Sequence, residues 1–119
     1  MAKNTTLSFE FYPPQTKEGV EKLKQTAKDL NQFNPEFFSV TFGAGGSTKA
    51  KTLETVLDLK KSGFNATPHI SCISSSKAEI KDLLDIYKSS KINHLVALRG
   101  DNPSGSINFG ELNYANELV

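Results

Sequence analysis

The chain has 119 residues, enough for one domain with its own core and too few for two ordinary ones, so residues 1–119 are expected to form a single domain. Its 14 basic and 13 acidic residues leave a net charge of +1, which argues against nucleic-acid binding because such surfaces carry a concentrated basic excess. With no apolar run of about 20 residues, no signal-peptide pattern and a single cysteine, Cys72, the sequence predicts a cytoplasmic protein without a membrane partner.

The first predicted elements are a strand and a helix. In residues 7–12, LSFEFY, apolar and polar side chains alternate as in a half-buried strand. Pro13-Pro14 ends this strand because neither proline has an N–H for the ladder. Thr16 can cap the following helix, whose apolar stripe is expected to be Val20, Leu23, Ala27, Leu30 and Phe33.

The second strand is predicted over residues 37–42, FFSVTF, and the glycine-rich residues 43–46 end it. Ser47 or Thr48 can cap the second helix, and Gly63 stands where a glycine commonly follows a helix. The expected buried stripe of this helix is Ala50, Leu53, Val56 and Leu57.

A third strand is predicted over residues 66–73, and a fourth over residues 94–98. Between them, Ser76 and Glu79 have the spacing of a capping box and precede a third helix. The stripe of that helix is Ile80, Leu83, Leu84 and Tyr87. A loop rich in Gly, Asn, Pro and Ser follows over residues 100–110, and residues 110–119 are predicted to begin a fourth helix.

This alternation indicates an α/β fold of about four βα units with parallel strands. A small doubly wound sheet and part of a (β/α)8 (TIM) barrel both fit the order of elements. Strands in a doubly wound sheet are nearly continuously apolar, whereas each strand here has polar residues on alternate positions. The pattern therefore favours a partial barrel.

Ligands of parallel α/β proteins bind beyond the carboxyl ends of the strands, which in this sequence carry Glu10, Thr41, His69, and Arg99 with Asp101. Each has an ordinary structural explanation: a solvated Glu10, a hydrogen-bonding His69, or an Arg99–Asp101 pair. Their coincidence at the same end of four strands favours a site. In a barrel mouth Glu10 would be partly desolvated, which favours its protonated form and suits proton donation near neutral pH.

Other chemistries find little support in the sequence. Glu10 has no partner carboxylate at glycosidase spacing, and no His, Cys and carboxylate cluster has metal-ligand spacing. Residues 43–48 precede a helix but match neither nucleotide-binding glycine pattern. Cys72 lies within a predicted strand, where a reactive thiolate is not expected.

Four segments in register, SFEFYPP, FFSVTFGAGGST, ATPHISC and LVALRGDNP, resemble the N-terminal part of the methylenetetrahydrofolate reductase family, and the similarity extends from Leu7 to Val119. The resemblance implies a flavoprotein oxidoreductase with a (β/α)8 barrel that acts in one-carbon metabolism and methionine biosynthesis. In that family NAD(P)H reduces FAD, and the reduced flavin passes hydride to 5,10-methylenetetrahydrofolate to give 5-methyltetrahydrofolate. NADH and NADPH are both compatible with the sequence.

The same resemblance implies roles for particular residues. Glu10 matches the catalytic general acid and contacts the folate substrate, and Asp101 lies near both the flavin and the folate pterin. Phe42 stands where the family often has Tyr. The cofactor-binding positions implied in this way are Thr41, Phe42, Ala44, His69, Arg99, Gly100, Asp101, Tyr114 and Ala115.

A complete barrel of this type needs about 250 residues, and this sequence supplies four of eight strands. The 119-residue chain alone is therefore expected to lack reductase activity and to bind FAD weakly or not at all, unless two copies close a barrel as a homo-oligomer. A non-catalytic flavin- or folate-binding fragment and an unrelated small α/β binding domain are the two alternatives.

Overall fold

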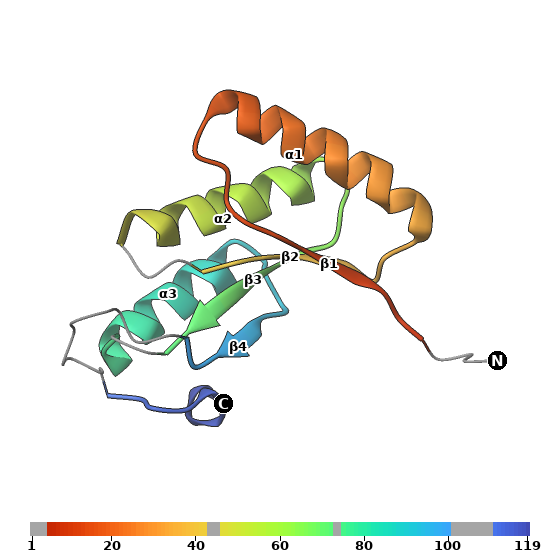
Figure 1. Cartoon of the computed structure of the whole chain (residues 1–119). Helices are drawn as coiled ribbons and strands as arrows, with labels where there is room; N and C mark the ends of the chain where they lie inside the picture. Colours follow the sequence, from red (N-terminus) through yellow and green to blue (C-terminus); the bar gives the residue numbers. More distant parts are fainter. Residues whose placement is uncertain (1–4, 43–45, 73–74, 101–110) are drawn as a thin grey trace.

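The computed structural model describes residues 5–42, 46–72, 75–100 and 111–119 (Figure 1). Strands and helices alternate along the chain: β1 (Ser8–Phe11), α1 (Lys17–Leu30), β2 (Phe37–Val40), α2 (Gly46–Lys61), β3 (Ala66–Ser71), α3 (Lys77–Ser89) and β4 (Val96–Leu98). Two short 3-10 helices complete the set, η1 (Asn31–Phe33) and η2 (Ala115–Leu118). The predicted α/β order is confirmed.

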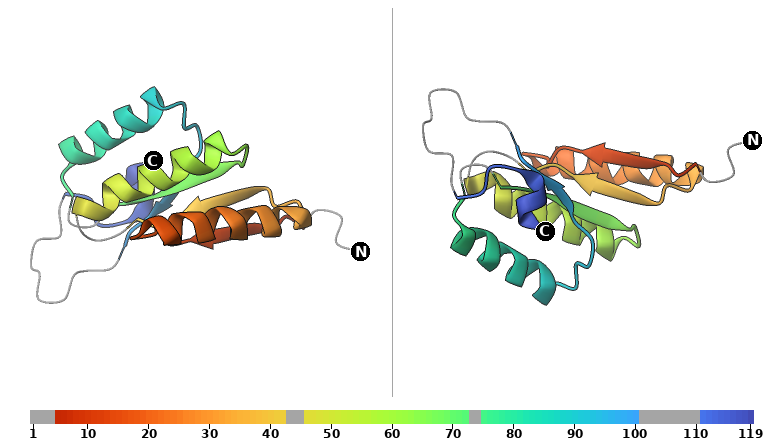
Figure 2. Two further views of the ribbon diagram at one scale, coloured as in Figure 1. Left: turned by 90° about the horizontal axis from the view of Figure 1, so that it is seen from above. Right: turned by 90° about the horizontal axis from the view of Figure 1, so that it is seen from below.

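The four strands form one parallel sheet in the order β1-β2-β3-β4. A doubly wound sheet reverses its strand order at a switch point, whereas each described strand here lies beside the one before it. Figure 2 shows α1 lying over β1 and β2, and α2 over β3, on the same side of the sheet. Sequential strands with helices on one face are the arrangement of part of a (β/α)8 barrel, as predicted.

The main core lies between the sheet and the three helices. Phe38 is at its centre, stacked on Phe9 and Phe11 with ring centroids 6.0 and 5.4 Å away and meeting Phe64 edge-on at 5.6 Å. Because α1, α2 and α3 all contribute to one buried cluster, they cover the same face of the sheet. Its buried members are Ala27, Phe38, Val40, Val56, Leu59, Ala66, Tyr87 and Ile92.

Local signals set the starts of two helices. The Thr16 hydroxyl accepts a hydrogen bond from the backbone N–H of Gly19 at 3.0 Å, and the Ser76 hydroxyl accepts one from the N–H of Glu79 at 3.1 Å. Both predicted caps are confirmed. Gly63 follows α2 with φ of 92°, a left-handed conformation that glycine adopts without strain.

The structure differs from prediction at several element ends. Helix α2 begins at Gly46, before the predicted caps Ser47 and Thr48, and Ala50 in its predicted stripe is exposed. Where the start of a fourth helix was predicted, the described residues contain the four-residue 3-10 turn η2. None of the described helices is long and apolar enough to cross a bilayer.

Candidate functional site on the polar face of the sheet

The face of the sheet opposite the helices carries small and ionisable side chains. Strand register aligns Glu10 of β1 with Ser39 of β2 and Thr67 of β3. Strand alternation places Phe9, Phe11, Phe38 and Ala66 on the helical side and leaves the polar residues on the other. We call this surface the polar face; its members are Glu10, Ser39, Thr67, His69 and Ser71.

Glu10 and His69 meet on the polar face across the intervening strand β2. Glu10 Oε1 lies 3.4 Å from His69 Nε2, and the two side chains are 57% and 5% exposed. The distance is within ion-pair range, but Nε2 is not aligned for a hydrogen bond and has no other partner among the described residues. The structure thus brings together two residues that the sequence placed at the same edge of the sheet.

The two partners occupy different environments. Burial lowers the pKa of the His69 imidazole below 6.5, and the nearby Glu10 carboxylate offsets part of that effect. More than half of the Glu10 side chain is exposed in this structure, and its partial desolvation in the mouth of a barrel stays a prediction. Strand β1 is at the end of the described sheet, so no neighbouring strand shields Glu10 on that side.

Thr41 continues from the end of β2 and is held there by its backbone. Its N–H donates to the carbonyl of Phe11 at 2.9 Å, and its own carbonyl accepts a hydrogen bond from the buried Thr52 hydroxyl at 2.7 Å. Thr52 was not singled out from the sequence. Its only signal was a place in the buried stripe of α2, four residues before Val56 and seven before Leu59.

Arg99 does not extend the polar face, contrary to the sequence-based prediction. The β3–β4 register places Val96 beside His69 and Leu98 beside Ser71, so the residues of β4 that lie on the polar face are apolar. The Arg99 Nε donates to the carbonyl of Asn113 at 3.0 Å, and its guanidinium carbon lies 6.0 Å from the centre of the Tyr114 ring. The Arg99 side chain is thus turned toward the C-terminal segment.

The remaining predicted positions lie on several elements. Phe42 packs against the second buried cluster, formed by Ile70, Cys72, Ile80 and Leu112, and Lys49 Nζ lies 5.5 Å from its ring centre. Gly100 has φ of 84°, Tyr114 is 62% exposed, and Ala115 begins η2. Ala44 and Asp101 lie outside the described residues.

Thiolate or metal chemistry finds no support in the described part of the chain. Cys72 is fully buried, burial raises the pKa of its thiol, and its Sγ lies 3.7 Å from the Arg99 carbonyl oxygen. Within residues 5–42, 46–72, 75–100 and 111–119, no three His, Cys, Asp or Glu residues gather as a metal site.

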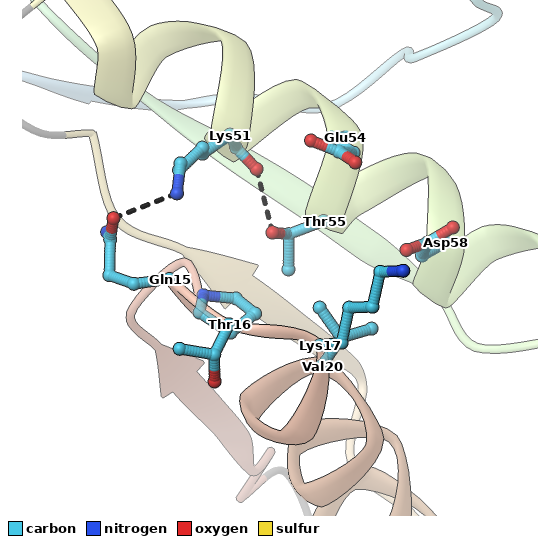
Figure 3. Close-up of a pocket in the computed structure, with 9 residues that line it drawn as sticks. Gln15, Thr16, Lys17, Val20, Lys51, Glu54, Thr55 and Asp58 are labelled. Atoms are coloured by element: carbon cyan, nitrogen blue, oxygen red, sulfur yellow. Dashed lines mark hydrogen bonds between the residues drawn. The ribbon is translucent and has the colours of Figure 1, made fainter.

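Two hollows on the described surface lie away from the Glu10–His69 pair. One, of about 180 Å³, separates the start of α1 from α2; there Lys51 Nζ donates to Gln15 Oε1 at 2.9 Å (Figure 3). The other, of about 340 Å³, is lined by Phe37, Thr67 and Val96 among others. Neither of these two hollows is lined by Glu10 or His69.

Comparison with known proteins identifies similar sequences over nearly the whole chain. A family model described as methylenetetrahydrofolate reductase matches residues 1–119. The chain is 38% identical to the 5,10-methylenetetrahydrofolate reductases of Salmonella typhimurium and Escherichia coli over 101 residues, which cover 84% of this chain and 34% of each relative. It is also 38% identical over 106 residues to methylenetetrahydrofolate reductase (NADH) 1 of Arabidopsis thaliana, covering 88% of this chain and 18% of that protein. The chain thus spans about a third of the length of these bacterial relatives.

Proposed function

The chain belongs to the methylenetetrahydrofolate reductase family, and we propose that it carries part of the active site for FAD-dependent reduction of 5,10-methylenetetrahydrofolate to 5-methyltetrahydrofolate, with NAD(P)H as electron donor. The folate substrate is supported by the names of the bacterial relatives, and NADH by the name of the plant relative. The observation that carries the proposal is the Glu10–His69 contact on the polar face of the parallel sheet.

Glu10 is proposed to act as the general acid toward the folate. Its carboxyl proton passes to a nitrogen of the five-membered ring, the adjacent C–N bond breaks, and the methylene carbon becomes an electrophilic iminium. Glu10 is left as a carboxylate near the cation that it has helped to form. Its exposure on the polar face allows a substrate to approach it directly.

The residues of the polar face fit a planar heterocycle such as the flavin ring. His69 Nε2 is buried and lacks a hydrogen-bond partner among the described residues, as expected for a group whose partner is a ligand. Thr41 adds a hydroxyl at the end of the neighbouring strand, where its backbone is held on both sides. FAD, when bound, would supply the hydride for the methylene carbon. The other proposed cofactor positions are Phe42, Ala44, Arg99, Gly100, Asp101, Tyr114 and Ala115, with Asp101 also toward the folate.

Two variants separate the proposed steps. Residues 1–119 would be joined to the remaining two thirds of the Escherichia coli relative, and 5-methyltetrahydrofolate formation would be followed together with flavin reduction by NADH. Glu10→Gln should abolish folate reduction and leave reduction of the flavin by NADH intact, because only the folate step needs the acid. Glu21→Gln, which makes the same charge change on α1, is the control. Full folate reduction in the Glu10 variant would refute the assigned role.

A non-catalytic flavin- or folate-binding role is the second candidate, and the buried His69 Nε2, which has no partner among the described residues, is compatible with it. Under either candidate, residues 1–119 expressed alone are expected to show no NADH-dependent folate reduction. FAD fluorescence quenching by that chain without turnover would favour the binding role. Turnover by the same chain would contradict the expected inactivity.

A further inference from the structure

The buried imidazole beside Glu10 can do more than contact a cofactor. His69 Nε2 faces Glu10 Oε1 at 3.4 Å, slightly longer than the about 2.7–3.2 Å of an aligned N–H···O hydrogen bond. No other described group satisfies this nitrogen, although the side chain is only 5% exposed. The two atoms are therefore within ion-pair range and not aligned as a hydrogen bond, so a proton can pass between them only after the imidazole ring or the carboxylate turns.

We infer that Glu10 and His69 bind a single shared proton, with His69 Nε2 as the second site for the proton that Glu10 delivers. This inference rests on the proposed role of Glu10 as the acid. It makes His69 a positioning residue that reloads Glu10; its Nε2 is free for the proposed contact with the flavin while the shared proton is on Glu10.

The transfer step is simple to balance. With the proton on His69, the pair is an imidazolium beside a carboxylate. Breaking the Nε2–H bond and forming the Oε1–H bond gives a neutral imidazole and a carboxylic acid, with no change in total charge. After Glu10 gives its proton to substrate, the proton on His69 Nε2 moves to Glu10 Oε1, and water at the exposed carboxylate then supplies the next proton to the pair. The buried nitrogen alone could not recover a proton so readily.

The surroundings leave Glu10 as the titratable partner of His69 in the described sheet. Strand β2 contributes Ser39 to the polar face and β4 contributes Val96 and Leu98, none of which titrates. Two other ionisable residues directly follow these strands: Cys72 after β3 and Arg99 after β4. Neither side chain is directed to the polar face. The Arg99 guanidinium is held by the Asn113 carbonyl, and the Cys72 side chain packs with Ile70 and Ile80 on the helical side. Burial lowers the pKa of His69, and the nearby Glu10 carboxylate offsets part of that shift.

Nuclear magnetic resonance of the 119-residue chain tests the inference without flavin or folate. The chain has two histidines, so the ring ¹³Cε1 signals of His69 and the exposed His94 can be followed together during a pH titration. Glu10→Gln should move the His69 midpoint to lower pH and leave His94 unchanged. Glu21→Gln, the same charge change on α1, should move neither. Glu10→Asp keeps the charge, so its His69 midpoint should lie above that of the Gln variant.

The reciprocal measurement follows the ¹³Cδ signal of Glu10. A shared proton requires an inflection of this signal at the His69 midpoint and loss of that inflection in His69→Gln. Equal His69 midpoints in the wild-type and Glu10→Gln chains would overturn the inference, as would equal midpoints in the Asp and Gln variants. Because these titrations need no turnover, a coupled pair in a chain whose grafted reductase lacks activity would refute the proposed function and leave the pairing standing.

Discussion

Tyr87 offers a sharp test of the packing described for the helical side of the sheet. Its ring is 1% exposed within the main core, and no described group hydrogen-bonds its hydroxyl. A buried polar group without a partner destabilises the folded state by about 1–3 kcal/mol. Tyr87→Phe removes the hydroxyl and keeps the ring, so we expect it to increase the free energy of unfolding at neutral pH by about 1 kcal/mol.

The same residue predicts a change in stability at alkaline pH. Burial raises the pKa of the Tyr87 hydroxyl from 10.0 to about 12. Between these values the unfolded chain has released the proton and the folded chain still holds it, so stability falls as pH rises. Two pKa units correspond to about 3 kcal/mol, which the wild-type chain should lose relative to Tyr87→Phe between about pH 10 and pH 12.

Urea denaturation at a series of pH values measures both effects. Tyr12→Phe is the matched control, since Tyr12 is 80% exposed and its hydroxyl should contribute little. A Tyr87→Phe chain that is less stable than wild type at neutral pH would show that the hydroxyl has a favourable partner. Parallel pH profiles for the two chains above pH 10 would refute the burial argument.

Three further predictions concern the N-terminal cap of α3, the loss of stability at acidic pH, and self-association through the sheet edges. Ser76→Ala should reduce the free energy of unfolding by about 1 kcal/mol in urea titrations, because the first turn of α3 loses its bond to the Glu79 N–H, whereas Ser89→Ala in the last turn should have a smaller effect. Because the folded-state pKa of His69 lies below 6.5, the unfolded chain binds more protons just below that pH, and the free energy of unfolding should fall on acidification. A plot of the free energy of unfolding against pH should have a smaller slope in this range for His69→Gln, and equal slopes for the two chains would contradict the prediction. The described sheet ends in β1 and β4, each with one unpaired edge, so sedimentation of the 119-residue chain should show concentration-dependent self-association, and a strict monomer at all concentrations would contradict this.

The parts of the fold set by neighbouring residues were predictable from sequence. Thr16 and Ser76 could be predicted as helix starts because a capping hydroxyl accepts a hydrogen bond from a backbone N–H only three residues away. The strands were identifiable because alternation has a period of two, and the polar residues at alternate strand positions favoured the sequential strand order of a barrel over a doubly wound sheet. These features depend on little beyond local geometry.

The parts of the site set by strand register were not predictable in the same way. Arg99 was expected to continue the polar face. Because Val96 pairs with His69 and Leu98 with Ser71, it is these two apolar residues of β4 that share the face of His69, and Arg99 does not. The exposure of Glu10 depends on β1 lying at the end of the described sheet, which alternation within β1 cannot reveal. The Thr52 bond to the Thr41 carbonyl joins α2 to β2 and likewise has no local signature.

Position in the sheet also explains why the two groups of the proposed proton-sharing pair differ. Strand β3 has β2 on one side and β4 on the other, with Val96 of β4 directly beside His69, whose side chain is 5% exposed. The bulky rings of Phe9, Phe11 and Phe38 all pack on the helical side and leave room above the small residues of the polar face. Glu10 reaches across from the less protected strand β1. One proton site is thus shielded from water and the other is open to it, a difference in environment that allows a neighbouring acid and base to hold a proton unequally.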